Sequence, residues 1–198
     1  MSTNNTRAEE FLRKFRESNG CIDVAWQAAR TNVLKPKLIE GLANMTRPEF
    51  ESLVLSNWFY PPRLEKRQYK EIIQKNGFEN VKLRLLNLLL GKGPMKDRIQ
   101  RVLNLKGVGP FVTSQFLSAI DDQYIMYHDD LVKGIRKLFQ TTFGKEFQYH
   151  FSDVVNKPTD AESYLELNEI CKAIRDNFGF KSLGEVHEFF VHYQQRLF

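Results

Sequence analysis

Cysteine, long hydrophobic runs and strand-like alternation are all scarce in this chain of 198 residues. Two cysteines, Cys21 and Cys171, are too few for a disulfide framework, a four-thiolate zinc site or an iron–sulfur cluster. The longest apolar patches, such as residues 85–90, are far shorter than a membrane-spanning helix. The first residues carry no apolar signal core. We therefore expect a reduced, intracellular protein that does not contact a membrane.

Helix start signals recur along the chain, whereas no segment shows the polar–apolar alternation of a half-buried strand. Three segments match the capping box, in which a Ser or Thr and a Glu three residues later satisfy free backbone N–H groups. These segments begin at Thr46, Thr159 and Ser182, and the first precedes an apolar run over residues 50–59. The pattern predicts an all-α protein with short loops at Pro and Gly clusters.

Positive charge is concentrated in the middle of the chain, although the net charge is only +5. Between Pro61 and Lys106, twelve basic residues face four acidic ones, which gives 12 − 4 = +8 there and 5 − 8 = −3 for the remainder. The basic residues are Arg63, Lys66, Arg67, Lys70, Lys75, Lys82, Arg84, Lys92, Lys96, Arg98, Arg101 and Lys106. Such an excess indicates a polyanionic partner, with nucleic acid as the first candidate, or else a lysine-rich solvated surface.

Residues 95–120 predict two helices joined by the tetrapeptide Lys106-Gly107-Val108-Gly109. Pro110 suits the first position of the second helix, where its missing N–H costs nothing. The two glycines allow positive φ and close approach of a ligand, and Val108 can fill the space between the helices. Free N–H groups at the start of the second helix would form an anion site for a backbone phosphate, with Arg101 and Lys106 adding charge.

An aspartate follows this hairpin at a characteristic distance. Asp129 lies 20 residues after Gly109 and opens the run Asp-Asp-Leu-Val-Lys. With the hairpin, this arrangement resembles the helix-hairpin-helix DNA glycosylase superfamily, which includes endonuclease III-like and alkyladenine glycosylases. The resemblance implies a two-lobed, all-α fold with a DNA-binding cleft between the lobes. Residues 50–139 would form the lobe that contains the helix-hairpin-helix at 95–120, and residues 1–49 and 140–198 would form the other.

The resemblance implies a monofunctional DNA glycosylase, working as a monomer on double-stranded DNA without a metal or cofactor. Asp129 would stabilise the oxocarbenium-like transition state of N-glycosidic bond cleavage and orient the attacking water. Asp130 competes for this role. Phe111 occupies the place where strand-nicking relatives carry a lysine nucleophile, which argues against a lyase. The Thr-Ala pair typical of the second helix is matched only loosely by Thr113-Ser114.

A glycosylase must also extrude its target base into a pocket. Aromatic and polar residues at the end of the helix that follows Thr46 are candidates for the wedge or pocket, namely Asn57, Trp58 and Tyr60. Tyr127 and His128 are further pocket candidates beside Asp129. Packing in the core explains such aromatic residues equally well.

Other functions find weaker support in the sequence. A non-catalytic helix-hairpin-helix module that recognises modified DNA needs the hairpin but no carboxylate. A metal nuclease would use the aspartates at 121, 122, 129 and 130, but no further ligand cluster accompanies them. His187 and His192 bracket a zinc-protease-like segment. They are five positions apart, which places them about 140° apart around a helix, so the two cannot share a metal.

Overall fold

The computed structural model describes residues 3–18, 20–56, 66–142 and 155–195. Every regular element in these ranges is a helix, which confirms the all-α class. Among the same residues, no helix combines the length and apolar character needed to cross a bilayer. The elements in chain order are α1 (Thr3–Glu17), α2 (Gly20–Pro36), the π-helix η1 (Lys37–Gly41), the 3₁₀-helix η2 (Leu42–Asn44), α3 (Arg47–Val54), α4 (Lys66–Asn76), α5 (Phe78–Leu90), α6 (Met95–Leu103), α7 (Pro110–Ile120), α8 (Asp129–Thr142), α10 (Ala161–Phe178) and α11 (Leu183–Gln195).

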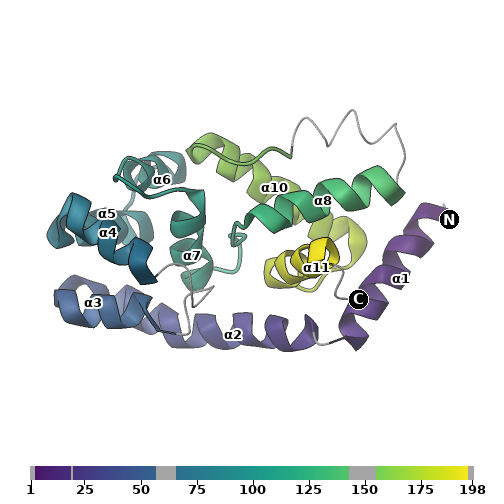
Figure 1. Ribbon diagram of the computed structural model, residues 1–198, viewed down its shortest axis with the longest axis horizontal. Helices are drawn as coiled ribbons and strands as arrows, with labels where there is room; N and C mark the ends of the chain where they lie inside the picture. The colour runs from purple at the N-terminus through teal and green to yellow at the C-terminus, as the bar shows by residue number, and fades with distance from the viewer. Residues whose placement is uncertain (1–2, 19, 57–65, 143–154, 196–198) are drawn as a thin grey trace.

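Helix α2 runs along one side of the molecule and contacts both groups of helices described here (Figure 1). Near its C-terminal end lie α3 to α7, which pack mainly on one another around α5. Toward its N-terminal end lie α1, α8 and α11. Contacts of α2 with α7 and of α6 with α10 join these parts of the molecule. The helix α6–α7 hairpin therefore adjoins the helices formed by the chain termini.

Helix α8 packs chiefly on α11 and also touches α1. At the crossing, a Cβ built on Gly134 would lie 2.1 Å from the backbone oxygen of Phe190, so only glycine permits this approach. The predicted lobe boundary at residue 139 lies within α8.

Side-chain caps mark the starts of α3 and α10. Thr46 and Glu49 form the predicted capping box of α3, with Thr46 N–H donating to Glu49 Oε2 at 2.8 Å. The cap of α10 is Asp160 and not Thr159, because the Asp160 carboxylate accepts the Ser163 N–H at 2.8 Å. Helix α3 ends at Val54, short of the predicted 50–59 run.

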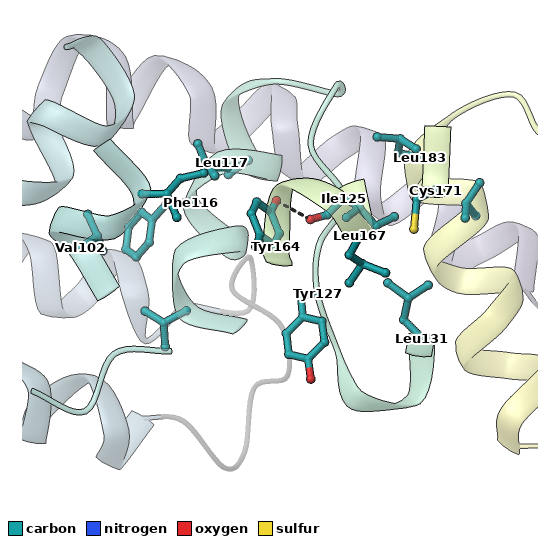
Figure 2. Packing of buried hydrophobic residues seen from close by; sticks show 14 of the residues in the cluster. Val102, Phe116, Leu117, Ile125, Tyr127, Leu131, Tyr164, Leu167, Cys171 and Leu183 are labelled. Carbon is teal, nitrogen blue, oxygen red and sulfur yellow. Dashed lines mark hydrogen bonds between the residues drawn. The ribbon is translucent and has the colours of Figure 1, made fainter. Parts of the chain in front are cut away.

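The buried apolar residues form one continuous cluster. Leu34, Leu38 and Leu42 recur every four residues along α2, η1 and η2, and all three are fully buried. The Phe50 and Phe116 rings stack with their centroids 6.3 Å apart, which joins α3 to α7. Figure 2 shows the part of this cluster that surrounds Tyr164 and Tyr127. This packing fixes α7 and α10, and the segment between α7 and α8 is held against them.

Candidate nucleic-acid interface and carboxylate site

The hairpin between α6 and α7 is a tight turn, and a side chain of α4 forms hydrogen bonds with its backbone. Gly107 has φ +82°, a left-handed conformation that L side chains rarely adopt. The Asn76 side chain accepts the Lys106 N–H at 2.9 Å and donates to the Lys106 carbonyl at 2.9 Å. Val108 N–H donates to the Leu105 carbonyl at 3.1 Å. Three bonds therefore hold the turn rigid around one glycine.

Only one of the two hairpin glycines needs its conformational freedom. Gly109 has φ −122° and ψ −179°, which is extended backbone open to any residue. A Cβ at Gly109 would meet nothing within 4 Å. The expectation of positive φ at both glycines is therefore wrong for Gly109, since that residue serves as the extended N-cap of α7.

Several backbone donors at the start of α7 remain open. Pro110 has no N–H, and the cap residue supplies no side-chain hydrogen bond. Within the described part of the chain, no hydrogen bond takes the N–H groups of Gly107, Gly109 or Phe111. Lys106 is exposed beside them. These N–H groups can donate hydrogen bonds to an anionic oxygen, which the positive end of the α7 dipole also attracts.

The segment that leads from α7 to Asp129 has no regular secondary structure and is held by buried side chains. Asn168 of α10 accepts the Ile125 N–H at 2.7 Å and donates to the Gln123 carbonyl at 3.0 Å. The Tyr164 hydroxyl donates to the Ile125 carbonyl at 2.9 Å (Figure 2). The Met126 carbonyl accepts a hydrogen bond from Nδ1 of His187 at 2.7 Å. Satisfying each buried polar group in this way fixes the backbone just before α8.

His187 remains neutral in this role. The side chain is fully buried, and burial lowers the pKa of His187 to about 3. The Nδ1–H form is the one that can donate to a carbonyl. His187 is therefore a structural anchor for the segment.

Asp129 begins α8 with a half-exposed side chain, 47% accessible to solvent. The Tyr127 hydroxyl donates to Oδ1, and Lys157 Nζ lies 3.2 Å from Oδ2. The hydrogen bond from Tyr127, followed by the hydrogen bond and charge of Lys157, lowers the pKa of Asp129. The carboxylate is thus ionised, oriented and reachable from solvent.

Asp130 faces a different direction. Its carboxylate pairs with Lys133 at 3.2 Å and accepts a hydrogen bond from Gln195 of α11 at 3.3 Å. Its side chain is 21% exposed, less than half the value for Asp129. The contacts therefore favour Asp129 as the carboxylate available to a ligand.

His128 and Tyr127, the pocket candidates beside Asp129, both form contacts within the protein. His128 caps α8, with Nδ1 accepting the Asp130 N–H at 3.1 Å, and its ring packs edge-on against Phe111 of α7 at 6.0 Å. Tyr127 is 3% exposed, and in Figure 2 its hydroxyl points away from Tyr164. Both residues therefore position the carboxylate. The Phe111 contact brings α7 and the start of α8 together.

The three other pocket candidates, Asn57, Trp58 and Tyr60, lie outside the described residues. So do the side chains of Arg63, Lys66 and Arg67 in the basic stretch.

Some of the other basic side chains between Pro61 and Lys106 already contact acidic side chains, carbonyl groups or an amide side chain of the protein. Lys75, Lys82 and Lys96 pair with Glu71, Glu79 and Glu162 at 3.3, 3.0 and 2.8 Å. Arg98 donates to the Asn87 carbonyl at the end of α5, and Arg101 reaches the Asn87 side chain at 3.4 Å. Among the described side chains of the stretch, Lys70, Arg84, Lys92 and Lys106 form no ion pair. These four and Arg101 remain for a polyanion.

Sequence reasoning missed Lys157, Asn76 and Asn168. Lys157 is 28 residues from Asp129, and Asn168 is 43 from Ile125. Arg136 of α8 brings Lys157 into place by donating to the Val155 carbonyl at 2.8 Å. No local pattern marks such long-range partners, because each is a polar residue within an ordinary helix or loop.

Comparison with known proteins gives no further guidance. A scan against protein-family models and searches of curated proteins and of solved structures found no match to this chain.

Proposed function

We propose that the protein is a monofunctional DNA glycosylase that hydrolyses the bond between a damaged or modified base and its sugar in duplex DNA. The observation that carries this proposal is the half-exposed, ionised carboxylate of Asp129 beside a hairpin with open N–H donors. The Phe111 and His128 rings, whose centroids are 6.0 Å apart, bring the start of α7 next to the start of α8. The hairpin would therefore bind the strand close to the nucleotide on whose sugar Asp129 acts.

The hairpin would hold one strand through its phosphates. Open N–H groups at Gly107, Gly109 and Phe111, together with Lys106, suit a backbone phosphate and read no sequence. Arg101 and the unpaired lysines would extend this positive surface and make affinity fall as salt rises. In the two-lobed arrangement that we propose, the packing of α8 on α11 supports a boundary just before Asp129. The carboxylate would then face the cleft between the lobes.

Asp129 would act on the sugar of the extruded nucleotide. Loss of the base builds positive charge on the sugar, and a fixed carboxylate stabilises that charge and orients the attacking water. Tyr127 holds Oδ1 by its hydroxyl, so Oδ2, which contacts Lys157, would be the oxygen that acts on the sugar. The Lys157 side chain is 67% exposed, and such pairs contribute at most about 1 kcal/mol. Lys157 can therefore move from Asp129 to an incoming phosphate at little cost.

A lyase is the second candidate, and the position of Lys157 is the observation that favours it. Its amine lies 3.2 Å from Asp129 Oδ2, close to where the sugar would sit. A lyase would need the Lys157 amine to attack the sugar carbon, whereas Nζ here is turned to Asp129 Oδ2. The geometry therefore favours hydrolysis by water over attack by Lys157.

The test is a panel of duplexes that each contain one alkylated purine, oxidised purine, uracil or modified cytosine. We expect wild-type protein to leave alkali-labile abasic sites in at least one duplex. Asp129→Asn should abolish base release at unchanged DNA affinity, whereas Asp130→Asn, the matched control, should retain it. Binding without any abasic product would instead identify a non-catalytic module. Breaks formed without alkali would indicate a nuclease, and a borohydride-trapped adduct that is lost in Lys157→Ala would indicate a lyase.

A further inference from the structure

Three metal-ligating side chains meet between α2 and α11. Asp23 of α2 and Glu188 and His192 of α11 each offer one ligand atom, and these atoms all lie within 4.8 Å of one another. His192 Nε2 lies 2.7 Å from Asp23 Oδ2 and 4.0 Å from Glu188 Oε2. Glu188 and His192 share a face of α11 because residues four apart are neighbours on a helix. The sequence analysis excluded His187 and His192 as a metal-binding pair. In the structure, His192 instead lies with Asp23 and Glu188.

Glu188 is the unusual member of the cluster. Its side chain is 4% exposed, and Oε1 accepts a hydrogen bond from Gln27 Nε2 at 2.7 Å. Within the described part of the chain, no hydrogen bond reaches the other oxygen, Oε2, whose neighbour at 4.0 Å is His192. Oε2 is not sealed from solvent, so a ligand can reach it without breaking a hydrogen bond. Burial of the side chain raises the pKa of Glu188 to about 7.

The other two ligands are oriented and accessible. The His192 ring lies edge-on to the Phe15 ring, with centroids 5.7 Å apart, which directs Nε2 toward Asp23. The Asp23 side chain is 49% exposed, so an ion can enter from solvent on that side. Gln27 fixes Glu188 from within the same helix that carries Asp23. Hydrogen bonds of this kind orient ligands in established metal sites.

We propose that Asp23, Glu188 and His192 bind a divalent transition-metal ion that joins α2 to α11. One imidazole and two carboxylates suit Zn²⁺ and its neighbours Co²⁺ and Mn²⁺, and three protein ligands leave a position for water. Metal–ligand bonds of about 2.1 Å place tetrahedral ligand atoms about 3.4 Å apart. The His192–Asp23 pair at 2.7 Å must open and the His192–Glu188 pair at 4.0 Å must close, each by less than about 1 Å. The ion would replace the direct contact between Asp23 Oδ2 and His192 Nε2.

The site is independent of the proposed glycosylase function, because it uses neither the hairpin nor Asp129. Its effect would be to fasten α2 against α11, the helix on which α8 packs. An ion held in the folded chain but not in the unfolded one stabilises the fold by mass action.

The experiment uses the full chain after treatment with a chelator and gel filtration. Co²⁺ is titrated and followed by its visible d–d absorption, and Zn²⁺ stoichiometry is measured by equilibrium dialysis with elemental analysis. We expect one ion per chain in wild-type protein, with at least tenfold weaker binding in Asp23→Asn, Glu188→Gln and His192→Gln. His128→Gln is the matched control, because His128 lies 3.7 Å from Asp130 without a third ligand in the described residues. This control should bind as wild type does.

A measurement on wild-type protein covers the case in which a variant does not fold. On addition of Zn²⁺, the ¹⁵N resonance of His192 Nε2 should shift while that of His128 stays in place. The proposal is overturned if wild-type protein binds no ion, if Glu188→Gln binds as tightly as wild type, or if the His192 resonance does not respond. Asp129→Asn should retain the ion, so failure of the glycosylase proposal would leave this result unaffected.

Discussion

The hydroxyl group of Tyr127 donates a hydrogen bond to Oδ1 of Asp129, two residues further along the chain. Tyr127 is itself fixed, since its ring is 3% exposed and its backbone N–H donates to Ser114 Oγ of α7 at 2.9 Å. An exposed carboxylate is therefore oriented by a residue anchored in the core. Preorganisation of this kind is what electrostatic stabilisation of a transition state needs.

Removing the Tyr127 hydroxyl should raise the pKa of Asp129. In wild-type protein the pKa lies below its ordinary value of 3.8, first because of the hydrogen bond from Tyr127. Tyr127→Phe keeps the ring and loses that bond, so the pKa should move up toward 3.8. The measurement is the pH titration of the Asp129 carboxyl ¹³C resonance by NMR. An unchanged midpoint in Tyr127→Phe would contradict this account.

The same shift fixes the sign of a pH effect on stability. A carboxyl whose pKa is depressed by folding stabilises the protein above its unfolded pKa, and this contribution is lost as pH falls through the folded value. We expect wild-type protein and Tyr127→Phe to differ in unfolding free energy at neutral pH and to converge at strongly acidic pH. Urea unfolding across this range measures the difference. If the difference in unfolding free energy between the two proteins grew as the pH falls, the prediction would be contradicted.

The two hairpin glycines should respond differently to alanine. Gly107→Ala places a side chain at φ +82° and should cost about 1–2 kcal/mol of unfolding free energy. Gly109→Ala adds a methyl group in extended backbone with nothing within 4 Å, so stability should change by less than about 0.5 kcal/mol. Urea unfolding of both variants tests this. Equal losses would show that Gly109 also needs its freedom.

Truncation of Asn168 should destabilise the segment before Asp129. Asn168→Ala leaves the Ile125 N–H and the Gln123 carbonyl without their buried partner, at a cost of about 1–3 kcal/mol. Hydrogen exchange should show the Ile125 amide losing protection more than amides in α5. If protection at Ile125 is unchanged, Asn168 does not hold the segment.

Close packing of α8 on α11 gives a further prediction. Gly134→Ala would bring a Cβ to 2.1 Å from the Phe190 oxygen, so the helices must separate, at a cost of about 1–3 kcal/mol or more. Gly93→Ala is the matched control, since a Cβ there meets nothing within 4 Å. Thermal unfolding compares the two. A melting temperature for Gly134→Ala equal to that of the control would rule out the close contact.

The all-α class, the Thr46 cap and the turn at Gly107 were predictable because local signals encode them: cap residues, a glycine between two helices, and helical periodicity. The partners of Asp129 were predictable only in part. Tyr127 lies two residues away, whereas Lys157 arrives through a contact between α8 and a distant segment. The Asp23–Glu188–His192 cluster requires the packing of α2 on α11, which periodicity does not specify.

The most direct test of the central claim is the single-turnover rate of base release by wild-type protein and Asp129→Asn, with the DNA saturated by each. The account predicts abasic product from wild-type protein on at least one modified duplex and a fall of at least a hundredfold in the variant at equal occupancy. Equal rates in the two proteins, or saturated DNA with no abasic product from wild type on any duplex, would contradict it.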